Sequence, residues 1–281
     1  MSNGRQWNST RAAIEKERTL SHYTRLRQVC LVAHDLEKTV DELCSVFDIR
    51  VCHRDPNVAK YGLVNALMPV GTSFIEVVSP AIPGPSTAAG RYLERRGGDG
   101  GYMVINDCDD VARFRTRAQQ LGIRIVEDRT YEGKANLLQL HPADTGGAIL
   151  EFDHHVGGEQ VDGAYHWAGT DWRRFACTTR VNGIEGVAMQ SAKPGRIAKK
   201  WGSVYGKRAI LGTGGCALAL DNGSLLFGFA PAGEDDAISA MFIVASDRAV
   251  IVREATARGL PVTKDERSIQ ICGVWFNLRD G

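Results

Sequence analysis

Four segments of the chain share one pattern of apolar and polar positions. Each begins with a short apolar run and continues into a stretch whose apolar residues recur at helical spacing, as Leu36, Val40, Leu43 and Phe47 do in the first. The pattern therefore predicts a strand followed by an amphipathic helix four times. These segments span residues 26–43, 101–122, 184–206 and 239–259.

The flanks of these segments complete a repeated unit. Asp35, Asp110 and Asp247 stand where an N-cap carboxylate would accept the first free amide protons of a helix. Helix-stop signals follow, with glycine at or near the helix end. Further apolar, extended segments come after each helix, such as GLVNALMPV and TSFIEVVSP after the first. We therefore predict an α+β protein built from four βαβββ modules.

The four modules predict two domains. We expect an N-terminal arm at 1–25, a first domain at 26–155, a connector at 156–175 and a second domain at 176–281. The connector is rich in glycine and then in tryptophan, which favours a linker that docks through its aromatic side chains. The arm and the module edges favour a homodimer, although four modules already pair within one chain.

Composition narrows the functional class. The 281 residues are 43% hydrophobic and 24% charged, with a net charge of +1, so the chain as a whole has no attraction to nucleic acid or to an anionic membrane. No apolar run approaches the roughly 18 residues of a membrane span, and the N-terminus lacks an apolar export signal. Seven cysteines without a CxxC pair favour reduced thiols and a cytoplasmic protein.

Two stretches carry a resemblance to a known family. FIEVVSPAIPGPSTAAGRYLERRGGDGGYMVI at 74–105 and HPADTGGAILEF at 141–152 resemble the vicinal oxygen chelate superfamily, especially its methylmalonyl-CoA epimerase-like and glyoxalase-like members. The resemblance implies that paired modules curl into a cupped sheet around an active site. It also implies four positions that usually hold a divalent metal, on the first and last strand of each module.

This chain departs from the family at those positions. Counting from the DLE and DDV turns and from the GGxxxE ending places Gln28, Glu76, Met103 and Glu151 there. Imidazole is the usual nitrogen ligand of such sites, and a thioether is a poor ligand for a hard or borderline divalent ion. Both expected histidines are therefore missing, and we expect no cofactor.

Three interpretations of the site remain open. In the first, Glu76 and Glu151 face one cavity without a metal and share general acid and base roles, with Gln28 donating a hydrogen bond that orients a carbonyl. In the second, a divalent metal is kept by an oxygen-rich shell of Gln28, Glu76 and Glu151, with His34 joining from the same wall of the strand. In the third, the pocket only binds and sequesters a small molecule.

Other residues suggest how a substrate is held. Met103 at the family position would make the floor of the cup apolar. Strand alternation places Tyr102 on the opposite face, where packing is its expected role, although its hydroxyl could serve as a donor to an enolate. Arg91 lies in a basic helix end that could contact a carboxylate or an acyl-CoA phosphate.

The corresponding positions of the second domain offer no metal or acid/base chemistry. They hold Gly186, Phe227, Ala240 and Asn277, and we expect Phe227 and Phe229 to help fill a degenerate cup. The sequence thus favours a small-molecule isomerase, epimerase or lyase that moves a proton beside a carbonyl in its first domain. Its substrate would be a carbonyl or acyl-CoA compound.

Overall fold

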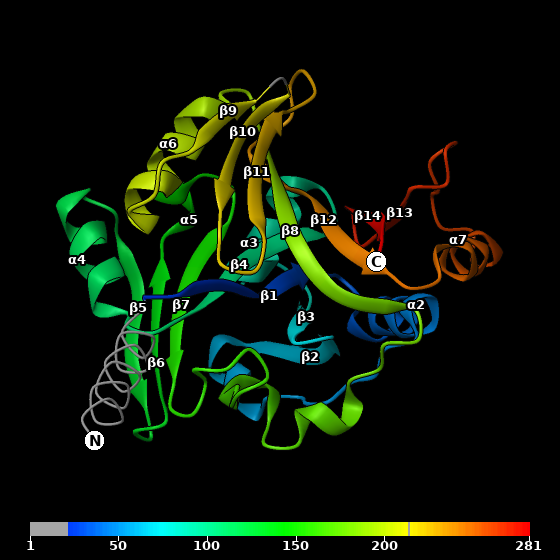
Figure 1. The fold of residues 1–281 in the computed structure, drawn as a ribbon, viewed down its shortest axis with the longest axis horizontal. Helices are drawn as coiled ribbons and strands as arrows, with labels where there is room; N and C mark the ends of the chain where they lie inside the picture. The colour runs from blue at the N-terminus through cyan, green and yellow to red at the C-terminus, as the bar shows by residue number, and fades with distance from the viewer. Residues whose placement is uncertain (1–21, 213) are drawn as a thin grey trace, which may run out of the picture.

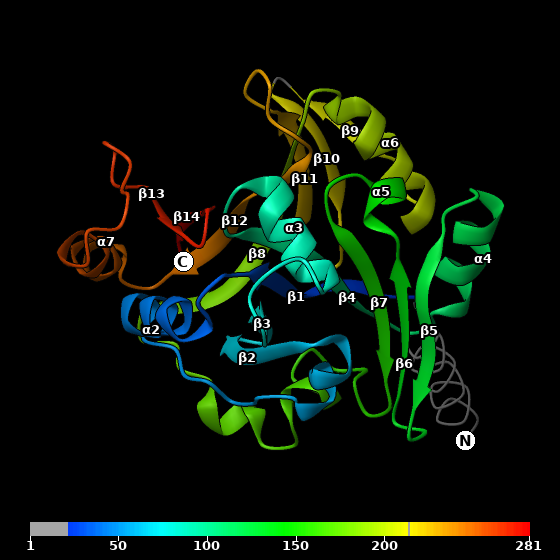
Figure 2. The ribbon, with the colours of Figure 1, turned by 180° about the vertical axis from the view of Figure 1, so that it is seen from behind.

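The computed structural model describes residues 22–212 and 214–281. Most of the arm predicted at 1–25 lies outside these residues, and Thr24 and Arg25 already belong to the first strand. Figures 1 and 2 show two curved sheets with helices packed around them. The α+β architecture predicted from the repeated pattern is confirmed.

The first sheet has seven strands in the order β2-β3-β1-β4-β7-β6-β5. These strands are β1 (Thr24–Val32), β2 (Leu63–Val70), β3 (Ser73–Pro80), β4 (Gly100–Cys108), β5 (Ile125–Tyr131), β6 (Ala135–Leu140) and β7 (Ile149–His155). Its helices are α2 (Leu36–Phe47), η1 (Pro56–Tyr61), α3 (Ala88–Arg96), α4 (Ala112–Gln120) and the short α5 (Pro142–Thr145). Figure 2 shows β2 and β3 on one side of the curved sheet and β5 to β7 on the other, with α3 between them.

The second sheet repeats this plan in the order β13-β14-β12-β8-β11-β10-β9. Its strands are β8 (Val181–Ser191), β9 (Ile210–Gly212), β10 (Gly215–Ala219), β11 (Ser224–Phe229), β12 (Ala237–Ala245), β13 (Ser268–Ile271) and β14 (Val274–Asp280). Its helices are α6 (Pro194–Tyr205) and α7 (Arg248–Ala257). Between the sheets, the connector holds η2 (His166–Ala168) and η3 (Trp172–Phe175).

Two of the four modules are shorter than predicted. The second and third have three strands after the helix, whereas the first and fourth have two strands and an isolated bridge, His53 to Leu67 and Val262 to Ile269. In the first module the missing strand is replaced by η1, because Pro56 starts a helical turn that Asp55 caps through the amide of Asn57. In all four modules the first and last strands pair in parallel.

The predicted helix caps are largely in place. Asp35 accepts a hydrogen bond from the amide of Lys38, and Asp247 accepts one from the amide of Val250. Asp110 lies one residue before the cap position of α4 and accepts from the amide of Ala112. Local sequence therefore determines where three of the four module helices begin.

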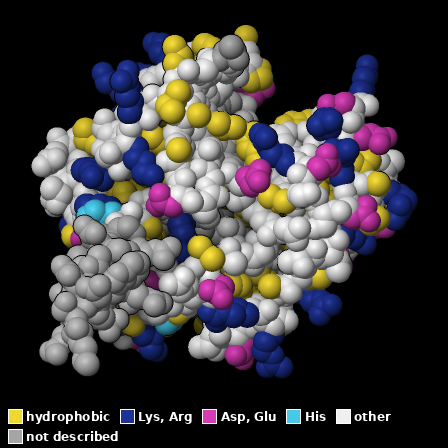
Figure 3. Space-filling model, viewed as in Figure 1, with side chains coloured by type: hydrophobic (Ala, Val, Ile, Leu, Met, Phe, Trp, Pro, Cys, Tyr) yellow, Lys and Arg dark blue, Asp and Glu magenta, His cyan; other side chains and the backbone are white. Residues whose placement is uncertain are grey.

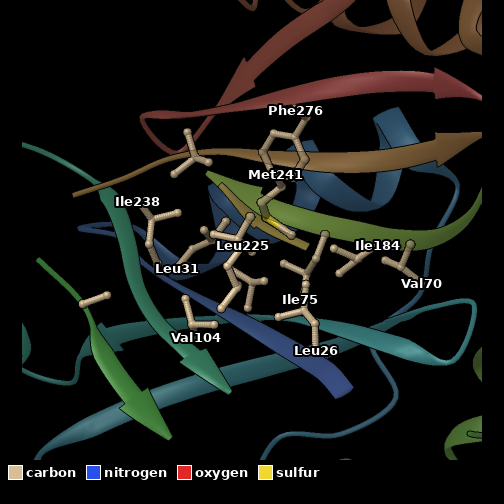
Figure 4. Packing of buried hydrophobic residues seen from close by; sticks show 14 of the residues in the cluster. Leu26, Leu31, Val70, Ile75, Val104, Ile184, Leu225, Ile238, Met241 and Phe276 are labelled. Carbon is tan, nitrogen blue, oxygen red and sulfur yellow. The ribbon is translucent and has the colours of Figure 1, made fainter. Parts of the chain in front are cut away.

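A single hydrophobic core joins the two sheets. Figure 4 shows Leu31 and Val104 of the first sheet directed toward Ile238 and Met241 of the second. The sheets approach so closely at Gly101 that an added Cβ would lie 2.4 Å from Cβ of Ile238. Because this face of the first sheet is committed to the core, only its opposite, concave face is free to form a site.

The surface shown in Figure 3 has no large patch of one charge. Positive and negative side chains are interspersed on the face shown in Figure 3. Exposed apolar residues gather at the top of that view, over β9 and the end of β11. All seven cysteines are free thiols. No helix in the described part of the chain is long and apolar enough to cross a membrane. Homodimer formation and cytoplasmic location stay predictions.

The shared core gives a stability prediction. Leu31 is fully buried in it, whereas Leu211 is 82% exposed. We expect Leu31→Ala to lower the free energy of unfolding by about 2–5 kcal/mol, since it leaves a cavity among packed side chains. Leu211→Ala should change it by less than about 0.5 kcal/mol. Urea unfolding measures both, and equal effects of the two variants would contradict a core that spans the sheets.

Candidate active site

The concave face of the first sheet holds a cavity of about 250 Å³. Its floor carries Gln28, Glu76 and Glu151, and most of its wall is apolar. Residues from η1, β2, α3, β4, β5 and the connector close the sides. The apolar wall is formed by Leu63, Leu67, Val78, Ala88, Ala89, Met103, Ile105, Val126, Leu137, Ile149 and Trp167. The arrangement places two carboxyl groups in a largely apolar chamber.

Glu76 on β3 is 8% exposed and is held by two side-chain amides. Gln28 donates from Nε2 to Oε2 at 2.8 Å, and Asn65 donates from Nδ2 to Oε1 at 2.6 Å. Burial raises the pKa of Glu76, and the amide donors oppose that rise because they stabilise the carboxylate. Each carboxylate oxygen therefore has a donor, which makes ionisation in this apolar surrounding feasible.

Glu151 on β7 is 3% exposed and has a different surrounding. Gln139 donates from Nε2 to one oxygen at 2.6 Å. Asp153 follows two residues later on the same strand, and its side chain accepts from Nε1 of Trp167 at 2.8 Å. Burial raises the pKa of Glu151 to about 7 and raises that of Asp153 well above its usual value. Glu151 thus titrates near neutral pH.

The strand register relates the two carboxyl groups by the module repeat. Glu76 lies opposite Cys30 across β1 and β3, and Glu151 lies opposite Ile105 across β4 and β7. Gln28 and Met103 come two residues before these partners and so face the same cavity. The structure brings Gln28, Glu76, Met103 and Glu151 together, as the repeat predicts.

Tyr102 lies in the cavity, contrary to the expectation from strand alternation. Cys30 opposes Met103 but Leu31 opposes Gly101, so Tyr102 is an extra residue in a β-bulge. A bulge turns two successive side chains toward one face. Tyr102 and Met103 therefore both line the cavity. Among residues 22–212 and 214–281, no hydrogen-bond partner is found for the Tyr102 hydroxyl.

His34 and Arg91 lie away from the cavity. The His34 side chain is 61% exposed, and its Nδ1 lies 2.7 Å from a carboxylate oxygen of Asp99. It follows the end of β1, so it does not continue the wall that Gln28 begins. Arg91 is exposed on α3 and donates to the carbonyl of Pro85 at 3.1 Å. Neither residue can contact a ligand that occupies this chamber.

The donor set does not fit the His-ligated metal of the family pattern. Both oxygens of Glu76 already accept amide hydrogen bonds, and the remaining family position holds a thioether. The shell that would include His34 is not assembled, because His34 lies beyond the end of β1 and does not line the cavity. Within the described ranges, no group of three or more His, Cys, Asp and Glu side chains is arranged to hold a metal ion.

The mouth of the cavity is crossed by an ionic cluster. Glu127 of β5 lies 3.4 Å from Nζ of Lys60 and 3.1 Å from Nε of Arg129. The hydroxyl of Tyr61 also donates to Glu127. These contacts join η1 to β5 across the opening, and they pair both mouth cations with the same carboxylate. The mouth thus keeps one net positive charge, whereas the apolar wall and the two carboxyl groups inside suit a neutral, apolar group.

Several site residues were missed at the level of sequence. Asn65 and Gln139 interrupt apolar strands as Glu76 and Glu151 do, and Asp153 follows Glu151 by the two-residue period that keeps one face. These signals could have been read. Trp167 donates from Nε1 to Asp153 at 2.8 Å, but it lies in the connector, where no periodicity indicates which way a side chain points.

The second cup is not filled as predicted. Phe227 faces the core shared by the sheets and packs edge-on against Trp201 of α6, with ring centroids 5.5 Å apart. Phe229 is 74% exposed. Because strand side chains alternate, the concave face instead carries residues such as Phe242 and Asn277 in a shallow, polar hollow.

Comparisons with known proteins agree with this architecture. The glyoxalase-like domain family matches residues 29–205, which is more than half of the chain. No curated protein sequence matches closely enough to serve as a relative.

Three solved structures are similar. A hypothetical protein from Staphylococcus aureus is 13% identical, covers 92% of this chain and 99% of its own, and has a TM-score of 0.61. A mutant of 4-hydroxymandelate synthase from Streptomyces coelicolor is 14% identical over 86% of this chain and 78% of its own, with a TM-score of 0.62. Methylmalonyl-CoA epimerase from Streptomyces coelicolor, in complex with 2-nitronate-propionyl-CoA, is 22% identical over 48% of this chain and 99% of its own, with a TM-score of 0.42.

The first two similarities extend over both domains and concern the fold alone. The family match over more than half of the chain shows the family. The chain belongs to the glyoxalase-like domain family of the vicinal oxygen chelate superfamily.

Proposed function

We propose that this protein is an isomerase, epimerase or lyase that transfers a proton at a carbon beside a carbonyl group, without a divalent metal. The observation that carries the proposal is that Glu76 and Glu151 line one apolar cavity, each buried and each hydrogen-bonded. Buried carboxyl groups are costly, so two that converge on one chamber favour a chemical role.

The surroundings of the two carboxyl groups assign their roles. Glu76 receives two amide donors that favour its charged form, so we assign it as the general base that removes the proton. Glu151 has a pKa raised to about 7 by burial, so it is protonated in a large fraction of molecules near neutral pH and can return a proton. Burial raises the pKa of both groups, and what distinguishes them is their donors, two side-chain amides for Glu76 and one for Glu151.

The carbonyl oxygen needs a donor as negative charge develops on it. Gln28 was predicted for this role, but its amide is engaged by Glu76 on one side and by Tyr165 on the other. Tyr102 lines the cavity, and burial raises the pKa of its hydroxyl, so it keeps its proton. We therefore assign Tyr102 as the donor to the carbonyl oxygen.

In this scheme atoms and charge balance within the chamber. Glu76 takes the proton as the carbon–hydrogen bond breaks, and the electron pair moves to the oxygen bonded by Tyr102. Glu151 then donates its proton to the carbon, and the two carboxyl groups regain their starting protonation states by proton exchange with water. The apolar wall favours a ketone or an acyl thioester with an apolar substituent at the reacting carbon.

Solvent exchange tests the proposal. In D₂O, the protein should incorporate deuterium beside the carbonyl of suitable 2-substituted ketones or thioesters, as followed by NMR. Glu76→Gln should slow this exchange by about 10²–10⁴-fold, since it removes the base. Glu151→Gln should keep exchange but lose inversion or isomerisation. Glu94→Gln, an exposed glutamate on α3, is the matched control and should behave as the parent protein.

The same experiment can contradict the scheme. Tight binding of a ligand that returns unchanged and unlabelled would favour sequestration, which the apolar wall also suits. Full exchange activity in Glu76→Gln would exclude Glu76 as the base.

Protein stability tests the environment of Glu151 without a substrate. Its pKa is about 7 in the folded protein against an ordinary 4.5, so the folded state holds the proton more tightly and stability falls as pH rises between these values. We expect the free energy of unfolding of Glu151→Gln, relative to that of the parent protein, to rise by a few kcal/mol between about pH 5 and about pH 8. Urea unfolding at both pH values measures this, and Glu94→Gln should show no such gain. If the difference in free energy of unfolding between Glu151→Gln and the parent protein did not change with pH, the pKa of Glu151 would not be raised by folding.

A further inference from the structure

The connector between the domains folds back beneath the active site. Figure 1 shows it below β2, on the first domain, although it follows β7 in the chain. Tyr165, Ala168 and Trp172 are almost fully buried there and pack with Leu67 and Phe74 of the first sheet. A segment that only joined two domains would not need to bury these side chains.

The ring of Tyr165 is held by packing against its neighbours. It stacks on Phe74 with ring centroids 4.7 Å apart, and the guanidinium of Arg27 lies beside both rings, 5.1 Å from the centroid of Tyr165 and 5.4 Å from that of Phe74. Arg27 in turn donates to the carbonyl of Val161, also in the connector. The Tyr165 hydroxyl is thereby directed at Gln28, whose Oε1 it reaches at 2.8 Å.

The Glu76 carboxylate, which can only accept, favours the Nε2 end of the Gln28 amide, and the Tyr165 hydroxyl holds the other end of that amide in place. With Oε1 accepting from Tyr165, Nε2 is the end that faces the carboxylate, at 2.8 Å. A flipped amide would place two acceptors together. Asn65 is oriented in the same way, because its Oδ1 accepts from the amide of Asp55 while its Nδ2 donates to Glu76.

We propose that Tyr165 is a positioning residue of the active site, which holds the Gln28 amide so that it donates to Glu76. The proposal rests on the proposed role of Glu76 as the base. It makes the connector a part of the active site, anchored by its packing on the first sheet. Tyr165 does not line the cavity, so it acts only through Gln28.

Removal of one hydroxyl tests this role. Tyr165→Phe should lower the rate of deuterium exchange at saturating substrate by about tenfold and leave KM nearly unchanged, since one buried hydrogen bond is lost away from the substrate. Ser191→Ala is the control, because it also removes one buried hydroxyl. Ser191 lies on β8 of the second sheet, and its hydroxyl accepts from the amide of Lys193 at 2.9 Å, outside the cavity. Both variants should lower the urea midpoint similarly, but only Tyr165→Phe should lower the rate.

A double-mutant cycle separates positioning from general damage. Gln28→Met cannot be oriented by a hydroxyl, so Tyr165→Phe should cause no further loss of rate in that background. Equal, additive losses in both backgrounds would overturn the proposal, as would a full rate in Tyr165→Phe.

A measurement without substrate distinguishes this proposal from the proposed function. The NMR signals of the Gln28 side-chain amide should shift in Tyr165→Phe and stay in place in Ser191→Ala. If they shift while no substrate exchanges, the positioning by Tyr165 stands and the proton-transfer function fails. If they do not shift, Tyr165 does not orient Gln28, whatever the activity.

Discussion

The burial of two carboxyl groups in an apolar chamber is the constraint on which the rest of this site depends. An unpaired charge in such a place would cost more than a small domain can tolerate. In this structure, side-chain amides donate hydrogen bonds to both carboxyl groups. Gln28 and Asn65 serve Glu76, and Gln139 serves Glu151. Behind these amides stand further donors, including the Tyr165 hydroxyl. The site is thus a network in which side-chain amides donate to the two carboxyl groups and are themselves held by further hydrogen bonds.

The two domains are built from the same paired modules but differ in their concave faces. In both, one face of the sheet is used for the core that the sheets share, as Leu31 and Met241 illustrate. The concave face of the first sheet retains carboxyl groups and amides, whereas that of the second is shallow and polar. The second domain stabilises the back of the first sheet, and the connector between them reaches the floor of the cavity.

Sequence reasoning found the parts of the site that follow from strand period. The repeat placed Gln28, Glu76, Met103 and Glu151 on one face, because side chains alternate regularly along paired strands. Prediction from the repeat is wrong where side chains do not alternate regularly along a strand. The bulge at Tyr102 turns an outward position inward, and nothing in the local sequence marks it. His34 was misplaced because β1 ends before it. Tyr165 and Trp167 depend on how an irregular segment docks, which only tertiary packing decides.

The central claim is that the carboxyl groups move the proton without a metal ion. It is tested most directly by measuring solvent exchange and metal content on the same sample, before and after exhaustive treatment with a chelator. The account predicts an unchanged exchange rate and a metal content far below one equivalent per chain. An exchange rate that falls as about one equivalent of a divalent metal is removed, and returns when that metal is restored, would contradict it.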